Sequence, residues 1–328
     1  MKTNPIKYTY ELLQSIPPYL KNVRRCRNLD FFQYEELSRV DFKPIKSLSS
    51  VLAYGYYRVV SKYKGKPFNF FTDYVEHGIN ANTDPEHVRM LGHLEHPLIR
   101  NIYVHGPFRK KVTEDCLAFD GIKNKKVHAI GPYILWSDNQ MSKEQLAQVK
   151  KKYGKILCVY PVHSTAAHTT DFKFHILIDK INEIRRDFQT VFMCMYWRDI
   201  QVHPDYVKRY LDEGYVIVSN GHGADPMFIS RQKDMMMVSD MIMANGFGSH
   251  IGYAIALGKP VYMIRAEYEY RDSKENAICI DARPKDVRDV EERCFDLFGE
   301  YNHTITEKQL EFVRYYWGTP QKTINNYE

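Results

Sequence analysis

A glycine-rich turn in the second half of the chain has the residue types of an anion site. It reads Asn245-Gly-Phe-Gly-Ser-His250 and follows the short apolar segment Met241–Ala244. Gly246 and Gly248 permit unusual backbone angles or the close approach of another group. Ser249 is a typical helix-capping residue, and apolar residues recur on one face of the segment that follows it. A strand, a glycine turn and a helix in this order present free backbone N–H groups and a positive dipole end, which bind phosphate.

Three earlier apolar segments, 156–160, 190–196 and 215–219, also end in polar or glycine turns. Hydroxyl and imidazole groups can contact phosphate or sugar hydroxyls, and a guanidinium can hold a phosphate with its planar fork. Each turn alone is explained equally well by local capping or a surface ion pair. Four successive turns of this kind indicate one ligand-binding edge. The candidate ligand-binding residues at the three earlier turns are His163, Ser164 and Thr165, then Arg198, and then Gly221, His222 and Gly223.

Acidic and imidazole groups that could transfer a proton occur in the first half of the chain. Asp73, Glu76 and His77 follow the segment 68–72, which we expect to be a strand, and precede Gly78. Any one of the three could act as general base for an attacking hydroxyl. A capped turn with surface acids is the alternative. Glu267, which follows the apolar segment 261–264, is a candidate for holding ribose hydroxyls, with solvated surface as the alternative.

Several classes of site are disfavoured by the motifs that the sequence lacks. The histidine-rich run from residue 87 to 105 matches no zinc template, and the six cysteines form no CxxC pair, so we expect no metal site and no disulfides. There is no GxxxxGK[ST], no GxGxxG after the first strand and no GxSxG. These absences disfavour P-loop kinases, the common dinucleotide oxidoreductases and hydrolases with a nucleophile elbow.

The alternation of elements predicts the fold class. From residue 155 onward, predicted strands at 156–160, 190–196, 215–219, 241–244 and 261–264 alternate with helices, at 171–188, 204–213 and 225–238 among others. This alternation favours a parallel, doubly wound sheet. The length of 328 residues suits two domains. We therefore predict an α/β fold with two Rossmann-like domains facing a cleft. The predicted divisions are 1–145, 146–305, and a closing helix at 306–328 that packs back on the first domain.

The net charge of +6 is partly clustered at residues 21–27, 109–111 and 123–126. Solvated surface is the default interpretation, and contact with an anionic membrane face is the second. Nucleic acid binding is disfavoured because no recognised motif accompanies the charge. No apolar run reaches the length of a membrane span, and no signal core follows the amino terminus. We expect a cytoplasmic protein, with peripheral contact at the inner membrane face as an alternative.

Three parts of the segment 239–261 resemble the donor side of bacterial GT-B glycosyltransferases, especially those that build capsular and other surface polysaccharides. They are Ser239-Asp240, Asn245-Gly-Phe-Gly-Ser-His-Ile-Gly-Tyr253 and Leu257-Gly-Lys-Pro-Val261, and the resemblance extends over residues 155–265. Glu76-His-Gly78 is similar to the His-Gly of CDP-glycerol polymer transferases, where the histidine is the base. It also stands where bacterial sialyltransferases carry an acidic pair and a glycine, and Pro161-Val-His163 stands in place of their His-Pro.

The resemblance implies that the second domain binds a nucleotide-sugar donor and that the first holds the acceptor and the base. The function it implies is metal-independent transfer of a sugar to a hydroxyl of a glycan or lipid-linked glycan in surface polysaccharide assembly. The nucleotide-sugar is a substrate, so no cofactor is expected. A nucleotide-sugar epimerase of the same two-domain shape and a non-catalytic partner in polysaccharide assembly are the alternatives.

Overall fold

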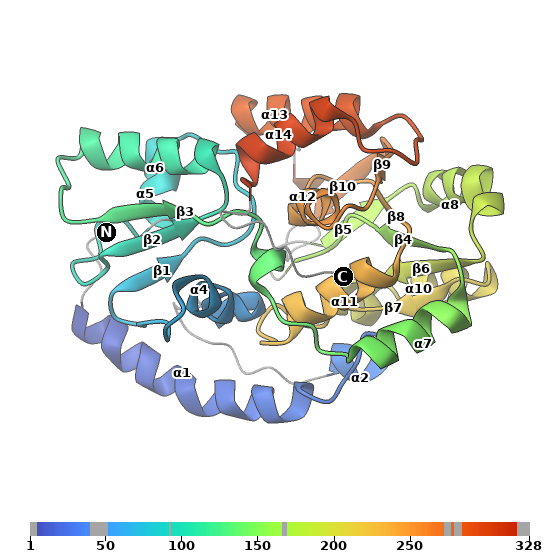
Figure 1. The fold of residues 1–328 in the computed structure, drawn as a ribbon, viewed down its shortest axis with the longest axis horizontal. Helices are drawn as coiled ribbons and strands as arrows, with labels where there is room; N and C mark the ends of the chain where they lie inside the picture. The colour runs from blue at the N-terminus through green and yellow to red at the C-terminus, as the bar shows by residue number, and fades with distance from the viewer. Residues whose placement is uncertain are drawn as a thin grey trace.

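Two parallel β-sheets, each covered by helices, organise the chain in the computed structural model (Figure 1). The structure describes residues 5–39, 52–91, 93–165, 169–271, 277–278 and 284–319. The two sheets lie in separate α/β units that face each other across a cleft. This arrangement confirms the predicted α/β fold with two Rossmann-like units.

The amino-terminal unit is built on the sheet β1-β2-β3, with β1 at Asp73–Val75, β2 at Asn101–Val104 and β3 at Lys126–Ala129. All pairs are parallel. Helices α5 (Pro85–Leu91) and α6 (Pro107–Phe119) cover one side, and α4 (Tyr56–Lys64) covers the other (Figure 1). The strand expected at 68–72 is wrong: this segment turns instead, because the Asn69 carbonyl accepts the N–H groups of Thr72 and Asp73.

The carboxy-terminal unit contains a five-stranded parallel sheet in the order β7-β6-β4-β8-β9. The chain moves from β4 to one side, through β6 and β7, and then returns to the other side at β8. The crevice between β4 and β8 is therefore the topological switch point at which such sheets bind ligands. The strands are β4 (Ile156–Tyr160), β6 (Thr190–Cys194), β7 (Val216–Val218), β8 (Met241–Ala244) and β9 (Val261–Met263).

Helices cover both faces of this larger sheet, and several of them carry an apolar stripe at helical spacing. In α8, for example, Leu177, Ile178 and Ile181 are buried against the sheet. The helices are α7 (Lys143–Tyr153), α8 (Phe174–Ile184), α9 (Trp197–Val202), α10 (Pro204–Asp212), α11 (Phe228–Val238), α12 (Ser249–Ala256), α13 (Lys285–Phe298) and α14 (Glu307–Tyr316).

A small antiparallel sheet was not predicted. It has the order β11-β10-β5, with β5 at Thr169–Phe172, β10 at Tyr268–Arg271 and β11 at Ala277–Ile278. The helix expected from residue 171 therefore starts later, at Phe174. The pairing partner of β5 lies about a hundred residues away, so local helical periodicity could not reveal it.

Four short or irregular elements and one long helix complete the described fold. Helix α1 runs over Pro5–Cys26, and Pro17 and Pro18 lie inside it. It passes along the outer edge of the molecule next to α4 (Figure 1). The short elements are α2 (Tyr34–Arg39) and the 3-10 turns η1 (Ala53–Gly55), η2 (Tyr133–Trp136) and η3 (Arg185–Asp187).

The end of the described chain crosses from one unit to the other. Helix α14 contacts α6 of the amino-terminal unit as well as α12 and α13. Trp317, which follows α14, is fully buried and lies on α12 at Gly252. The domain divisions at 145 and 305 stay predictions.

Gly252→Ala is expected to lower the free energy of unfolding by about 1–3 kcal/mol, the usual cost of overpacking. A Cβ at this position would lie 2.3 Å from the Trp317 ring, which is buried and cannot move aside. Chemical denaturation measures the loss. Trp317→Phe in the same chain should restore part of it, because the smaller ring leaves room. Wild-type stability in Gly252→Ala would contradict this packing.

Candidate functional site

A cleft of about 380 Å³ lies between the two units, at the carboxyl ends of β1, β4, β6 and β8. His77 and Gly78 line it from the amino-terminal unit, and Val162 and the turn 246–250 line it from the carboxy-terminal unit. The cleft therefore coincides with the switch point between β4 and β8. Its volume suits a small-molecule ligand.

His77 lies in the cleft directly after β1. Its side chain is exposed, and no residue in the described part of the chain hydrogen-bonds to its imidazole. The rings of Tyr54 and Tyr56 lie 4.8 and 6.1 Å from it. The surrounding protein displaces water, and His163 adds nearby positive charge, so the pKa of His77 falls to about 4. The imidazole is therefore neutral at pH 7 and able to accept a proton.

Asp73 and Glu76 do not line the cleft. Each is buried and paired with a cation: Asp73 with Lys64, and Glu76 with Arg109. The Arg109 side chain is itself buried, donates to both Glu76 carboxylate oxygens and also donates to the Asn82 carbonyl at 2.8 Å. These carboxylates hold the amino-terminal unit together. Of the three candidate bases, the structure brings only His77 to the cleft.

The turn 245–250 joins β8 to α12 and lies opposite His77. The Asn245 side chain accepts the Val162 N–H at 2.6 Å and so ties this turn to the loop after β4. Its amide nitrogen is buried without a partner among the described residues. Gly246 and Gly248 leave the backbone open to the cleft. The turn therefore meets α12 at the helix end that favours an anion.

We expected Ser249 to cap α12 with its side chain, and this expectation is wrong. The cap residue is Gly248, and it makes no side-chain hydrogen bond. The Ser249 hydroxyl instead accepts the N–H of Ile79 at 2.9 Å, across the cleft. The serine thus links the two units beside His77. This contact joins residues 170 positions apart, so no local pattern could predict it.

His250 stacks on Tyr160, with ring centroids 5.1 Å apart, and its Nε2 is buried without a partner among the described residues. Burial, followed by the nearby charge of His163, lowers the pKa of His250 to about 3. His163 itself is exposed at the cleft, and its Nδ1 lies 2.8 Å from the Ser164 carbonyl. The cleft therefore contains three histidines, of which His77 and His250 are held neutral.

The other residues of the loop after β4 divide into two groups. Thr165 lines the cleft. Ser164 does not, because it is fully buried: its N–H donates to the Asp199 carboxylate at 3.0 Å and its hydroxyl accepts the Thr170 N–H at 2.9 Å. Arg198, in the first turn of α9, also lies outside the lining of the cleft. Ser164 thus shapes the loop without reaching a ligand in the cleft.

The turn 221–223 packs against other parts of the chain instead of opening to the cleft. The Gly223 carbonyl accepts the Tyr54 N–H at 2.6 Å, and a Cβ on Gly221 would lie 3.1 Å from the Asp225 carboxylate. His222 packs against Trp197 with tilted rings whose centroids are 4.2 Å apart. Its Nδ1 accepts the Ala224 N–H, and burial lowers its pKa to about 4. The glycines of this turn serve close packing.

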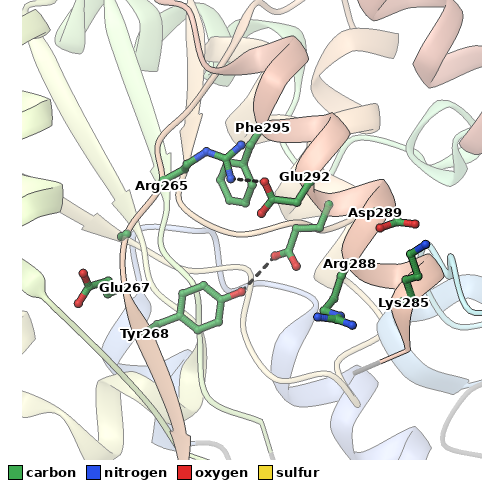
Figure 2. Close-up of a pocket in the computed structure, with 10 residues that line it drawn as sticks. Arg265, Glu267, Tyr268, Lys285, Arg288, Asp289, Glu292 and Phe295 are labelled. Atoms are coloured by element: carbon green, nitrogen blue, oxygen red, sulfur yellow. Dashed lines mark hydrogen bonds and ion pairs between the residues drawn. The ribbon is translucent and has the colours of Figure 1, made fainter. Parts of the chain in front are cut away.

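Glu267 lies at a different hollow, of about 610 Å³, formed by the segment after β9 and by α13. Figure 2 shows it on the opposite side of Tyr268 from Lys285 and Arg288. Glu267 pairs with Lys173. The antiparallel sheet draws the chain after β9 away from the switch point, so the structure does not bring Glu267 to the cleft.

Aromatic residues that sequence reasoning missed form much of the cleft wall. Tyr54 and Tyr56 come from a segment without a strand-turn-helix pattern, and the local signal there is the glycine between them. Tyr54 has a left-handed backbone (φ 57°), which is rare for a bulky residue and marks a strained position. Side-chain hydrogen bonds join Tyr54 to Tyr196 and Tyr56 to Tyr253. The missed lining residues are Tyr54, Tyr56, Tyr196, Phe228, Gln232, Tyr253 and Tyr270.

The described residues also bear on other classes of site. No group of three or more His, Cys, Asp or Glu side chains that could hold a metal ion occurs in this part of the chain. None of the helices within the described ranges combines the length and the apolar character needed to cross a bilayer.

Comparisons with known proteins give only weak similarities. No protein-family model matches the chain, and no curated protein matches it. Among solved structures, the chain is similar to Anabaena HepE in complex with UDP and glucose, with 16% identity and a TM-score of 0.33 over 63% of this chain and 55% of that one. It therefore spans little more than half the length of HepE.

Two further solved structures are similar to parts of the chain. The E. coli ADP-heptose lipopolysaccharide heptosyltransferase II is 13% identical, with a TM-score of 0.30 over 54% of this chain and 66% of that one. A glycosyltransferase from Rickettsia africae is 16% identical, with a TM-score of 0.29 over 58% and 50%. Similarities of this strength establish neither a family nor an activity for this chain.

Proposed function

We propose that this chain is a glycosyltransferase that moves a sugar from a nucleotide-sugar donor to an acceptor hydroxyl without a metal ion. One observation carries the proposal: His77, a neutral imidazole, and the glycine turn that opens α12 line the same cleft from opposite units. A base for the acceptor and an anion site for the leaving group are the two parts that such a transfer needs.

In the proposed reaction, the donor phosphate lies against the backbone N–H groups of the turn 246–250 and the positive end of α12. The acceptor oxygen forms a bond to the anomeric carbon, and the bond between that carbon and the phosphate oxygen breaks. His77 takes the acceptor proton, and the nucleotide leaves with the bonding electron pair. The Ser249–Ile79 contact draws the units together at this point, which helps to keep competing water out.

The proposed acceptor is a hydroxyl of a glycan or lipid-linked glycan in surface polysaccharide assembly. This part rests on the resemblance of residues 155–265 to enzymes of that class. His163 and Thr165, which also line the cleft, would contact the donor together with His250.

Calorimetry of the full chain with UDP, CDP, CMP and GDP tests the donor site first. Binding of at least one nucleotide is expected, and binding of none would overturn the proposal in favour of a non-catalytic partner. The matching nucleotide-sugar is then incubated with and without glycan acceptors. Nucleotide release that depends on an acceptor supports transfer. A new sugar isomer formed from the donor alone would identify an epimerase.

Gly246→Asp is expected to weaken nucleotide binding at least about a hundredfold. A carboxylate at roughly 4 Å from a phosphate charge costs on the order of 4 kcal/mol near a protein surface. The backbone of Gly246 is not left-handed. A Cβ added to Gly246 would lie 3.4 Å from the Cβ of Val162, which is an ordinary van der Waals contact, so the variant should fold. Calorimetry measures the loss.

Gly65→Asp is the matched control. Gly65 ends α4, has open space around it and adopts a left-handed backbone that aspartate tolerates. Equal affinity losses in the two variants would show that the effect comes from general charge and not from the turn.

A further inference from the structure

Helix α1 presents its apolar side to solvent. Five large apolar residues are exposed, and their spacing of four, three, three and four residues places them on one face of the helix. They are Ile6 (80% exposed), Tyr10 (60%), Leu13 (57%), Ile16 (43%) and Leu20 (50%). A monomeric soluble protein rarely leaves such a continuous apolar patch uncovered, so the patch marks an interaction surface. We call it the α1 outer face.

The opposite side of α1, which faces the protein, is more polar. Ser15 and Asn22 are buried there, and the Glu11 side chain is only 14% exposed. Tyr19 of α1 and Tyr57 of α4 join their hydroxyls in a hydrogen bond. At the end of the helix, Arg231 donates to the Cys26 carbonyl at 2.7 Å. Polar contacts thus help to attach the helix, and the five residues of the α1 outer face are left for another occupant.

The charges beside the α1 outer face decide which occupant suits it. The helix contains Lys7, Lys21, Arg24 and Arg25, and Glu11 is its only acidic residue. Arg24 and Arg25 are exposed at its carboxyl end, and Arg27 follows them. A second copy of this helix would bring like charges together at low dielectric, which is unfavourable. Anionic lipid headgroups would neutralise the same charges.

We propose that α1 lies in the surface of an anionic lipid bilayer, with its outer face among the acyl chains and its basic residues at the headgroups. An exposed apolar stripe with flanking Lys and Arg is typical of helices that lie in the bilayer interface. The helix occupies the outer edge of the molecule, where the rest of the fold does not obstruct a flat surface (Figure 1). The inference is independent of the proposed transferase function.

Vesicle flotation of the full chain tests the inference. Vesicles of pure phosphatidylcholine are compared with vesicles in which about a third of the lipid is phosphatidylglycerol. Binding to the anionic vesicles only is expected, and it should weaken as salt is raised, because salt screens the charges. Failure to float with anionic vesicles would overturn the proposal.

Two variants separate the apolar and the basic contributions. Leu13→Ser with Leu20→Ser should weaken binding by about tenfold or more, since two inserted side chains lose their apolar burial. Arg24→Gln with Arg25→Gln should weaken it by about fivefold per charge. All four side chains are exposed, so the thermal midpoint should stay at the wild-type value.

Leu211→Ser is the matched control, because Leu211 is an exposed leucine (47%) on α10. It should bind vesicles as the wild type does, and an equal loss in this variant would contradict the assignment to α1. Light scattering tests whether a second copy of this chain occupies the α1 outer face instead. If the wild type is a dimer and Leu13→Ser with Leu20→Ser is a monomer, the α1 outer face is an interface between copies and the lipid proposal is wrong.

Discussion

His77→Ala is expected to lower kcat/KM for sugar transfer by about 10²- to 10⁴-fold, the range that a positioned general base contributes. Among the described residues, the histidine is the candidate base that the fold brings to the cleft, while Asp73 and Glu76 are buried in ion pairs. Nucleotide release in the presence of the acceptor measures the change. Nucleotide affinity should change little, because the proposed phosphate site, the turn 246–250, belongs to the other unit.

His175→Ala serves as the control, since His175 is an exposed histidine on α8 that does not line the cleft. A similar loss in both variants would rule out His77 as the base.

The pH profile gives a second test of His77. A base works only when it is deprotonated, so kcat/KM falls as the pH drops through its pKa. Partial desolvation by the surrounding protein, together with the nearby charge of His163, lowers the pKa of His77 to about 4, whereas a free histidine titrates at about 6.5. We therefore expect kcat/KM to stay level between about pH 7.5 and pH 5.5. A decline centred near the value of a free histidine would contradict the geometry described for the cleft.

Glu76→Ala is expected to lower the free energy of unfolding by about 3–5 kcal/mol, because it leaves a buried arginine without its counter-charge. The Arg109 side chain is 2% exposed and its guanidinium donates to both Glu76 oxygens. The Tyr133 hydroxyl adds a hydrogen bond to the Glu76 carbonyl at 3.1 Å, which ties η2 to this point. Chemical denaturation measures the loss.

A control variant and a double variant accompany Glu76→Ala. Glu86→Ala, at an exposed position on α5, should change stability by no more than about 0.5 kcal/mol. Glu76→Leu combined with Arg109→Met removes both charges and should recover much of the stability. If Glu76→Ala unfolds like the wild type but loses turnover, Glu76 acts in catalysis and its structural role is refuted.

Local patterns predicted the carboxy-terminal sheet closely. The strands expected at 156–160 and 241–244 agree with β4 and β8, and the helix after the glycine turn agrees with α12. These elements are buried and strongly patterned, so their own residues determine them. The antiparallel sheet was missed, because its pairing depends on contacts between segments that are distant in the chain.

The amino-acid sequence by itself determined the α/β architecture, and it predicted an anion site at the turn 245–250 and a base within the short stretch 73–77. Only the tertiary structure decided among the candidates in that stretch. Lys64 and Arg109 neutralise Asp73 and Glu76, and His77 is left to face the turn. The fold likewise placed Glu267 at another hollow and packed Gly221 and Gly223 inside. Residue types and spacing describe what a side chain can do, but its partners come from segments far away in the chain.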